Sequence, residues 1–369
     1  MYKTIEELVT RVDERNSDGT VSELIGVSID KCFIKSVANT NGTDLSKYKI
    51  IRKNDFAVSL MQVSRDGKIP VARLEEYEEA IMSPAYPIFR VKDKNIILPD
   101  YLEMWFKRPE FDREAAFIAV GGVRGSMPWE EFAKMKLPVP SIEKQQKIVN
   151  AYKIVTDRIA LKQRINDNLL DSVQAIFRSW FVDYDPFDGV CPSNWETGCV
   201  EDIAEFFDSM RKPLSSLERT DMERIYPYYG AVSIVDYVDD YIFDGEYLLV
   251  SEDGIYVVDE NGHPLIQHIS GKFWANNHAH ILKGKSGFNE DSLYLFLANT
   301  NMAPIVTGAA QPKINQANLK SFPITIPDSE TMLKFNNIIQ PFFDQRLTNE
   351  SEIKKLEALQ SLLLTRLVD

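Results

Sequence analysis

The side chains of this sequence that are best suited to chemistry are hydrogen-bond donors in predicted loops, several of which contain glycine. Arginine and lysine can pair with phosphate groups or guanine, glutamine can pair with adenine, and glycine lets a backbone approach a ligand closely. These donors predict contacts with a nucleic acid, and a solvated surface charge is the alternative for each of them. The candidates are Arg65, Lys68 and Arg124 in the first half of the chain and Arg211, Lys212, Gln311 and Lys313 in the second.

Catalytic and cofactor-binding motifs are missing from the sequence. It contains no Asn-Pro-Pro-Tyr-type methyltransferase motif, no glycine-rich cofactor loop after a strand and no Gly-x-x-x-x-Gly-Lys phosphate loop. We therefore expect no catalytic residue and no bound S-adenosylmethionine or ATP. His278 and His280 would share one face of a strand, but no third ligand follows at a metal-binding spacing. We expect no metal, and predict core, hydrogen-bonding, loop-fixing or DNA-facing roles for these histidines.

The composition describes a folded and acidic chain. Of its 369 residues 44% are apolar and 11% aromatic, which is enough for two packed cores. The formal net charge of −13 argues against a protein that binds nucleic acid alone, because non-specific affinity depends on clustered positive charge. The positive surface must therefore be local or supplied by partners. Three cysteines without a disulfide pattern, and no leader segment or membrane-length apolar run, predict a soluble cytoplasmic protein.

The elements that must position these side chains are organised as a repeat. Similar residues recur 187 positions apart near the middle and near the end of the chain. A repeat in which a block of about 130 to 140 residues leads into one long helix implies two equivalent modules separated by helical spacers. The matched pairs include Gly121 and Gly308, Met127 and Ile314, Leu137 and Ile324, and Pro140 and Pro327.

Both modules show the same order of short strands and one clear helix. In the first, β-rich runs such as residues 55–61 and 85–91 alternate with turns and precede a helix over residues 100–106. The second repeats this order and ends with a helix over residues 291–297. The mixture predicts an α+β fold for each module. We expect a first domain of residues 1–140, a first spacer helix of 141–185, a second domain of 186–327 and a second spacer helix of 328–369.

Apolar residues in the two long helices recur at alternating steps of three and four residues. Ser141 and Asp328 can cap the first turns, and the spacing favours pairing of the two helices as a coiled coil. Packing of each helix on its own domain is the alternative. The predicted seam comprises Tyr152, Val155, Ile159, Leu169, Val173 and Ile176 in the first helix and Ile339, Phe342, Ile353, Leu356 and Leu363 in the second.

Polar residues interrupt this seam at the same place in both copies, Lys162 in the first and Asn349 in the second. Polar seam residues fix register and orientation at a cost in stability. A helix of about 40 residues is roughly 60 Å long, which corresponds to on the order of 15 to 18 base pairs of B-DNA. Spacer length would then set the gap between two short sites. Pro341 is expected to bend the second helix or to delay its start.

Five groups of residues, in a fixed order along the chain, match the strings of a known family. They are Leu137–Pro140 with Glu143, Gln145, Gln146, Ile148 and Val149; Ile176–Phe181 with Asp183, Asp185 and Pro186; Tyr228–Ala231; Trp274–Leu282; and Gly308–Asn315. Each matching string is weak alone, but their order and the repeat make the match specific. The departure is Val123–Ser126 in the first module, where the second has the more family-like Ala310–Lys313. Over essentially its whole length the chain resembles the specificity subunits of Type I restriction-modification systems.

The resemblance implies two target-recognition domains that each read half of a bipartite sequence in double-stranded DNA. It also implies that the two helices pair as an antiparallel coiled coil that spaces the half-sites and docks two modification subunits, which methylate adenine after flipping it out of the duplex. Restriction subunits would join for translocation and cleavage, and the chain itself would be non-catalytic. The alternative from another class is a coiled-coil scaffold that joins two protein-binding domains without DNA.

Overall fold

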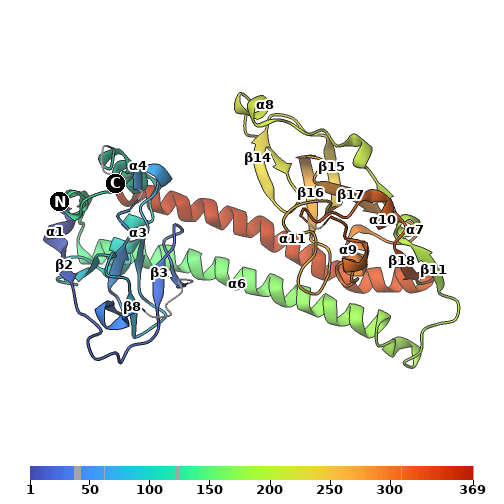
Figure 1. Ribbon diagram of the computed structural model, residues 1–369, viewed down its shortest axis with the longest axis horizontal. Helices are drawn as coiled ribbons and strands as arrows, with labels where there is room; N and C mark the ends of the chain where they lie inside the picture. Colours follow the sequence, from blue (N-terminus) through green and yellow to red (C-terminus); the bar gives the residue numbers. More distant parts are fainter. Residues whose placement is uncertain (37–42, 62, 121–124, 309, 369) are drawn as a thin grey trace. The chain divides into compact units, whose positions relative to one another are not determined.

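The computed structural model describes residues 1–36, 43–61, 63–120, 125–308 and 310–368 of the chain (Figure 1). These residues form two compact units. The first comprises Met1–Lys162 with Glu352–Asp369, and the second comprises Gln163–Ser351. Each unit contains one globular block and part of each long helix, α6 (Ile142–Phe181) and α11 (Ser329–Thr365).

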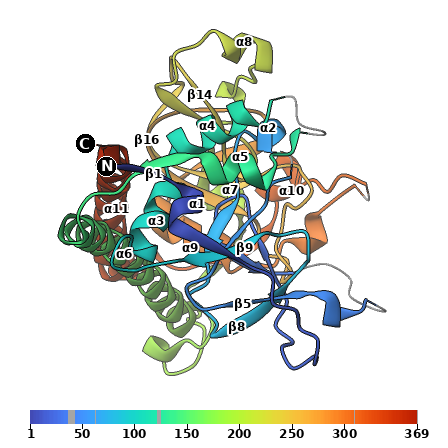
Figure 2. The same ribbon diagram turned by 90° about the vertical axis from the view of Figure 1, so that its left-hand side faces the viewer.

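The first unit is built on an antiparallel sheet of four strands in the order β2-β9-β6-β7. Because side chains alternate along a strand, Phe56 and Phe89 face the helices, whereas Ala57 and Ile88 face a second layer of strands. Figure 2 looks onto this unit. The sheet contains β2 (Val9–Val12), β6 (Phe56–Val58), β7 (Val71–Arg73) and β9 (Ile88–Val91); the helices are α3 (Pro99–Phe106), α4 (Pro109–Ile118) and α5 (Trp129–Lys134); the second layer contains β5 (Lys49–Arg52) and β8 (Glu79–Met82).

Both ends of the chain contribute to this unit. Strand β1 (Tyr2–Thr4) pairs with β10 (Lys136–Pro138). At the other end Leu364 and Leu367 are buried in the same core as Phe56, and the hydroxyl of Tyr101 donates to the carbonyl of Leu367 at 3.5 Å. The remaining elements are α1 (Ile5–Leu8), β3 (Ile25–Val27), β4 (Phe33–Lys35), α2 (Val63–Asp66) and the 3₁₀ turns η1 (Leu45–Lys47) and η6 (Arg366–Val368).

The second unit is built on a six-stranded sheet in the order β12-β17-β15-β16-β13-β14. All neighbours are antiparallel except β13 and β16. Its strands are β12 (Ala204–Phe206), β13 (Tyr226–Tyr229), β14 (Ile234–Val238), β15 (Phe243–Ser251), β16 (Ile266–Ala275) and β17 (Ala279–Gly284); a separate pair joins β11 (Glu196–Cys199) to β18 (Pro323–Ile326); the helices are α7 (Val200–Ile203), α8 (Ser216–Thr220), α9 (Glu290–Ala298) and α10 (Gln316–Lys320), with 3₁₀ turns η3 (Asp185–Phe187), η4 (Asp208–Met210) and η5 (Ala303–Ile305).

The strand orders of the two units correspond. The order β2-β9-β6-β7 in the first unit matches β12-β17-β15-β16 in the second. Each unit also has a separate two-stranded pair, β1 with β10 or β11 with β18, in which the second strand directly precedes the long helix. Met127 and Ile314, which are matched in the 187-residue repeat, make equivalent backbone hydrogen bonds in the two units. The amide of Met127 donates to the carbonyl of Leu60, shortly after β6, at 2.8 Å, and the amide of Ile314 donates to the carbonyl of Glu252, directly after β15, at 2.9 Å. The α+β fold predicted for two similar modules, each followed by a long helix, is confirmed.

The two long helices run antiparallel within each unit. In the first unit Gln360 donates to Thr156 at 2.8 Å, and Lys162 pairs with Glu352 at 2.7 Å, so the numbering falls along α11 as it rises along α6. Both helices also pack on the globular blocks, because Val173 and Ile339 lie in one core with strands of the second unit. The two interpretations of the helical stripe, pairing and packing on the domains, therefore both describe parts of it.

The predicted seam residues differ in burial. Val155, Ile159, Val173 and Ile339 are buried, and the others are partly buried: Tyr152, Leu169, Ile176, Phe342, Ile353, Leu356 and Leu363. Asp328 caps α11 by accepting the amide of Thr331 at 3.0 Å, and Ser141 accepts that of Lys144 at 3.4 Å. Pro341 lies inside α11, well after its start, so it does not delay the helix.

The polar residue of the second seam has a partner of its own kind. The side-chain amide of Asn349 donates to the side-chain oxygen of Asn166 at 2.8 Å, and both residues are buried. In the first unit the corresponding polar residue, Lys162, pairs with Glu352. Because a one-residue slip would separate each pair, these contacts specify the register of the helices.

Replacing Asn349 with leucine is expected to lower the free energy of unfolding of the second unit by about 1–3 kcal/mol, because the oxygen of Asn166 loses a donor while it stays buried. The double variant Asn166→Leu/Asn349→Leu should regain at least half of this loss. Native-state hydrogen exchange of the α6 amides measures both effects. Additive losses in the two single variants would show that the asparagines are not coupled.

Candidate nucleic-acid interface

Four loops meet at one edge of the main sheet of the second unit. Strands β12 and β15 end at this edge and β17 begins there, since β17 is antiparallel to both. The loops are residues 207–214 after β12, residues 252–265 after β15, the turn 276–278 before β17, and residues 306–315 before α10. Sheet topology thus gathers loops that lie far apart in the sequence, including those with the predicted donors.

Glu252 binds two of the predicted donors. Its carboxylate lies 2.5 Å from a guanidinium nitrogen of Arg211 and 2.9 Å from the amine of Lys313. Arg211 also donates to the carbonyl of Ala279 at 2.7 Å, and its side chain is only 14% exposed, whereas that of Lys313 is 43% exposed. The geometry makes Arg211 a clamp between loops and leaves Lys313 at the surface.

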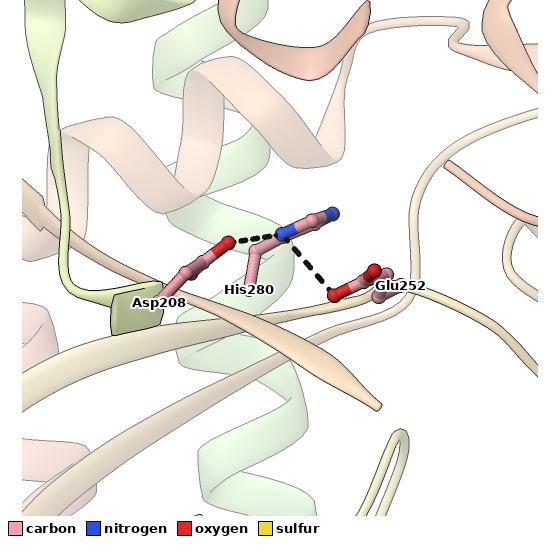
Figure 3. Close-up of side chains that lie close together, drawn as sticks. All are labelled: Asp208, Glu252 and His280. Carbon is pink, nitrogen blue, oxygen red and sulfur yellow. Dashed lines mark hydrogen bonds and ion pairs between the residues drawn. The ribbon is translucent and has the colours of Figure 1, made fainter. Parts of the chain in front are cut away.

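A buried histidine extends this network (Figure 3). Nδ1 of His280 lies 2.6 Å from a carboxylate oxygen of Asp208 and 3.6 Å from Glu252, and Nε2 lies 2.8 Å from the carbonyl of Ile314. A carbonyl oxygen only accepts, so Nε2 carries a proton. Burial acts to raise the pKa of Asp208, but hydrogen bonds from His280 and the Ile281 amide and the charge of Arg211 leave this pKa below its usual value. These contacts favour the carboxylate form of Asp208, which lies within hydrogen-bond distance of Nδ1.

The carboxyl group of Glu252 is held ionised in the same way. Burial raises its pKa, but hydrogen bonds from Lys313 and Arg211 and the charge of His280 outweigh burial, so the pKa lies below its usual value. The hydrogen bond to Glu252 in turn raises the pKa of the Lys313 amine. The network thus combines two carboxylates with the cationic side chains of Arg211 and Lys313 and the imidazole of His280.

Asp208, Glu252 and His280 are also residue types that can bind a cation. One ligand atom from each of Asp208, Glu252 and His280 lies within 4.8 Å of the others. Both ring nitrogens of His280 already lie within hydrogen-bond distance of protein oxygens, however, and Arg211 and Lys313 occupy the carboxylate of Glu252. A metal would have to displace these protons and cations, so the arrangement fits an ion-pair network better than a metal centre.

The network fixes the loop that carries Gln311. Ile314 is held through both its amide and its carbonyl, and the side chain of Gln316 donates to Asp208 at 2.7 Å. Gly308 has a φ of +84°, and a Cβ there would lie 2.3 Å from the carbonyl oxygen of Gln311. The tight turn therefore requires glycine, and it leaves Gln311 exposed.

Lys212 follows Arg211 on the neighbouring loop. Its carbonyl accepts the indole N–H of Trp274 at 2.6 Å, and its amine lies 6.0 Å from the centroid of the same ring. Lys212 is thereby tied to the end of β16. Arg211 and Lys212 lie on one loop, and Arg211 and Lys313 contact the same carboxylate, that of Glu252.

The first unit places its candidates beside the corresponding loop. Arg65 lies in α2 and pairs with Asp66 at 2.8 Å, and Lys68 is half exposed, with Asp30 at 3.9 Å. Gly125 has a φ of +74°, and a Cβ there would lie 2.5 Å from the hydroxyl of Ser64, so Gly125 lies directly against α2. Arg124 lies outside the described residues.

Asp208 and Glu252 are central to this interface but were not among the predicted residues. Both lie just beyond the ends of strands, and Asp208 precedes Arg211 by one helical turn. That spacing is a weak signal for an ion pair. Nothing in the sequence links Glu252 to Arg211 or Lys313, because the contact depends on the order of the strands.

Comparison with known proteins bears on this arrangement. A family model described as the Type I restriction modification DNA specificity domain matches residues 25–171 and again residues 192–359, which together make up most of the chain. The chain belongs to this family. The two matches follow the repeat, since each contains most of one globular block and part of the helix that follows it.

Individual relatives agree with this assignment. A putative type I restriction enzyme specificity subunit of Haemophilus influenzae is 39% identical over 35% of this chain and 32% of its own length. The specificity subunit of a type I restriction enzyme of Methanocaldococcus jannaschii is 22% identical over 74% of this chain and 69% of its own length. The crystal structure of a Type I S subunit from M. genitalium superposes with a TM-score of 0.57 at 14% identity, covering all of this chain and 96% of that one, which shows a shared fold.

Among the described residues, every helix is either too short or too polar to cross a lipid bilayer. The long helices α6 and α11 carry charged side chains throughout their length.

Proposed function

We propose that the chain is the DNA-recognition subunit of a Type I restriction-modification complex and has no catalytic activity of its own. Each globular block would read one half of a bipartite target in double-stranded DNA. The observation that carries this proposal is the double match to the specificity domain, combined with the same loop arrangement in both blocks. The modules proposed are residues 1–140 and 186–327, with spacers over 141–185 and 328–369.

The proposed contacts come from the loops at the sheet edge. Gln311 and Lys313 are exposed and suit base edges or phosphates. Arg211 is mostly buried in its ion pairs, so we assign it chiefly to holding these loops together. The other proposed contacts are Lys212, Arg65, Lys68 and Arg124.

The paired helices are proposed to dock two modification subunits that methylate adenine, with restriction subunits joining them in the cytoplasm. Work inside such a complex agrees with a net charge of −13, because partners can supply part of the phosphate contact. Spacing by the helices would then set the gap between the half-sites.

Single-molecule methylation mapping tests this function. DNA from cells that express the chain together with a Type I modification subunit should carry one bipartite adenine-methylation motif, and cells that lack only this chain should lose methylation at that motif entirely. A stable complex with the modification subunit that produces no motif would contradict the proposal and would favour the scaffold alternative.

A further inference from the structure

The loop after β15 carries two successive apolar residues whose side chains are exposed. Ile255 is 83% exposed and Tyr256 is 72% exposed, although Val257, the next residue, is buried. Single exposed apolar residues are ordinary on protein surfaces. Two large ones in succession at the tip of a loop, within the proposed DNA interface, require a reason.

The base of this tip is firmly held. Before it, Glu252 pairs with Lys313, and the carboxylate of Asp253 lies 2.6 Å from Nδ1 of His278. After it, the carbonyl of Val257 accepts the amide of Leu265 at 3.1 Å. The tip consists of only Gly254, Ile255 and Tyr256, so its apolar side chains are presented by a short segment anchored on both sides.

The first unit exposes apolar side chains at the corresponding place. Met61 follows Leu60, whose carbonyl accepts the amide of Met127 just as Glu252 accepts that of Ile314, and Met61 is largely exposed. Phe117 and Val120, at the end of α4 and just before the repeated loop, are also largely exposed. Each unit therefore has both hydrogen-bond donors and exposed apolar side chains on the corresponding loops.

We propose that Ile255 and Tyr256 insert between base pairs of the DNA half-site read by the second unit. This inference rests on the proposed function. An enzyme that methylates a base inside a duplex must first flip that base out, which unstacks its neighbours. Apolar side chains inserted at such a step replace the lost stacking and hold the duplex open, and a tyrosine ring can stack on a base.

The surroundings favour DNA over a protein partner. Lys313 and Gln311 lie on the loop that is paired to this one, through the bridge between Asp253 and Lys313 and the ion pair with Glu252. A cation and an amide beside the tip can contact phosphate and base edges while the apolar groups enter the stack. A site for an apolar protein surface would not need these donors.

The test uses the complex of the full chain with its modification subunits and the variant Ile255→Ser/Tyr256→Ser. The probe is a duplex that carries the motif found by methylation mapping, with 2-aminopurine placed at successive positions of the second half-site. The wild-type complex should raise the fluorescence at one step, and the double variant should lose this rise and bind at least tenfold more weakly. Leu217→Ser is the matched control, because Leu217 is 80% exposed in the same unit but lies on α8, and it should behave as wild type.

A duplex with an abasic site at the affected step separates insertion from ordinary contact. The gap removes the stacking that must be broken, so the double variant should bind this duplex within about threefold of wild type. An equal loss of affinity on both duplexes, or loss of assembly with the modification subunits, would overturn insertion in favour of surface contact or a protein interface. A wild-type complex that does not distinguish the motif from a scrambled duplex would instead refute the proposed function itself.

Discussion

Replacing Glu252 with alanine is expected to lower the free energy of unfolding of the second unit by about 3–5 kcal/mol. The substitution removes the carboxylate that Arg211 and Lys313 share, and it leaves the fully buried ring of His280 beside one carboxylate in place of two. Lys313 can turn toward water, but Arg211 and His280 cannot. Native-state hydrogen exchange of the β15 and β17 amides reports the stability of this unit alone.

A matched control distinguishes a buried network from an ordinary ion pair. Glu201 pairs with Lys320 at 3.0 Å in the same unit, and the side chains of Glu201 and Lys320 are 55% and 31% exposed. Glu201→Ala should therefore cost less than about 1 kcal/mol. Equal losses in the two variants would show that the network around Glu252 contributes no more than a surface pair.

The dependence on pH provides a second check of the same prediction. The pKa values of Asp208 and Glu252 are lowered in the folded protein, so their ion pairs contribute fully above the unfolded carboxyl pKa of about 4. This contribution is lost as the pH falls through the lower folded values. The stability difference between wild type and Glu252→Ala should thus shrink as the pH falls below about 4.

The sequence predicted the fold more completely than the interface, for a physical reason. The 187-residue repeat and the helical periodicity can be read along the chain without knowing which residues meet in space. The repeat corresponds to the matching strand orders of the two units, and the periodicity corresponds to α6 and α11. An interface depends on which side chains meet across strands. Arg211 was predicted to contact DNA because of its charge and its turn, whereas its accessibility is decided by Glu252, forty-one residues away in sequence.

The boundary of the first module shows the same limit. Helical periodicity assigns the last turns of the second helix to the seam, and nothing in the pattern of residues 1–140 indicates that they need a further segment. In the folded chain Leu364 and Leu367 complete the core around Phe56, and Tyr101 reaches the carbonyl of Leu367. A core can close with residues from the far end of the chain when the termini belong to one unit.

Exchange of modules should therefore have an all-or-none effect on specificity but a graded effect on stability. Replacing residues 1–140 with those of a family member that methylates a different motif is expected to change one half of the motif completely, with methylation of the parental motif falling to background. The other half should stay unchanged, since residues 186–327 and their loops are untouched. Single-molecule methylation mapping of cells that express the chimera reads both halves at once.

The C-terminal packing determines which chimera works best. A chimera with donor residues 1–140 alone places a foreign core against Leu364 and Leu367, whose contacts are native only to the parental module. Adding the donor counterpart of residues 352–369 restores a matched core, so this second chimera should be the more stable and the more fully methylating of the two, with the same new motif. A change in both halves of the motif, in either chimera, would mean that the modules do not read DNA independently and that the helices carry sequence information as well as spacing.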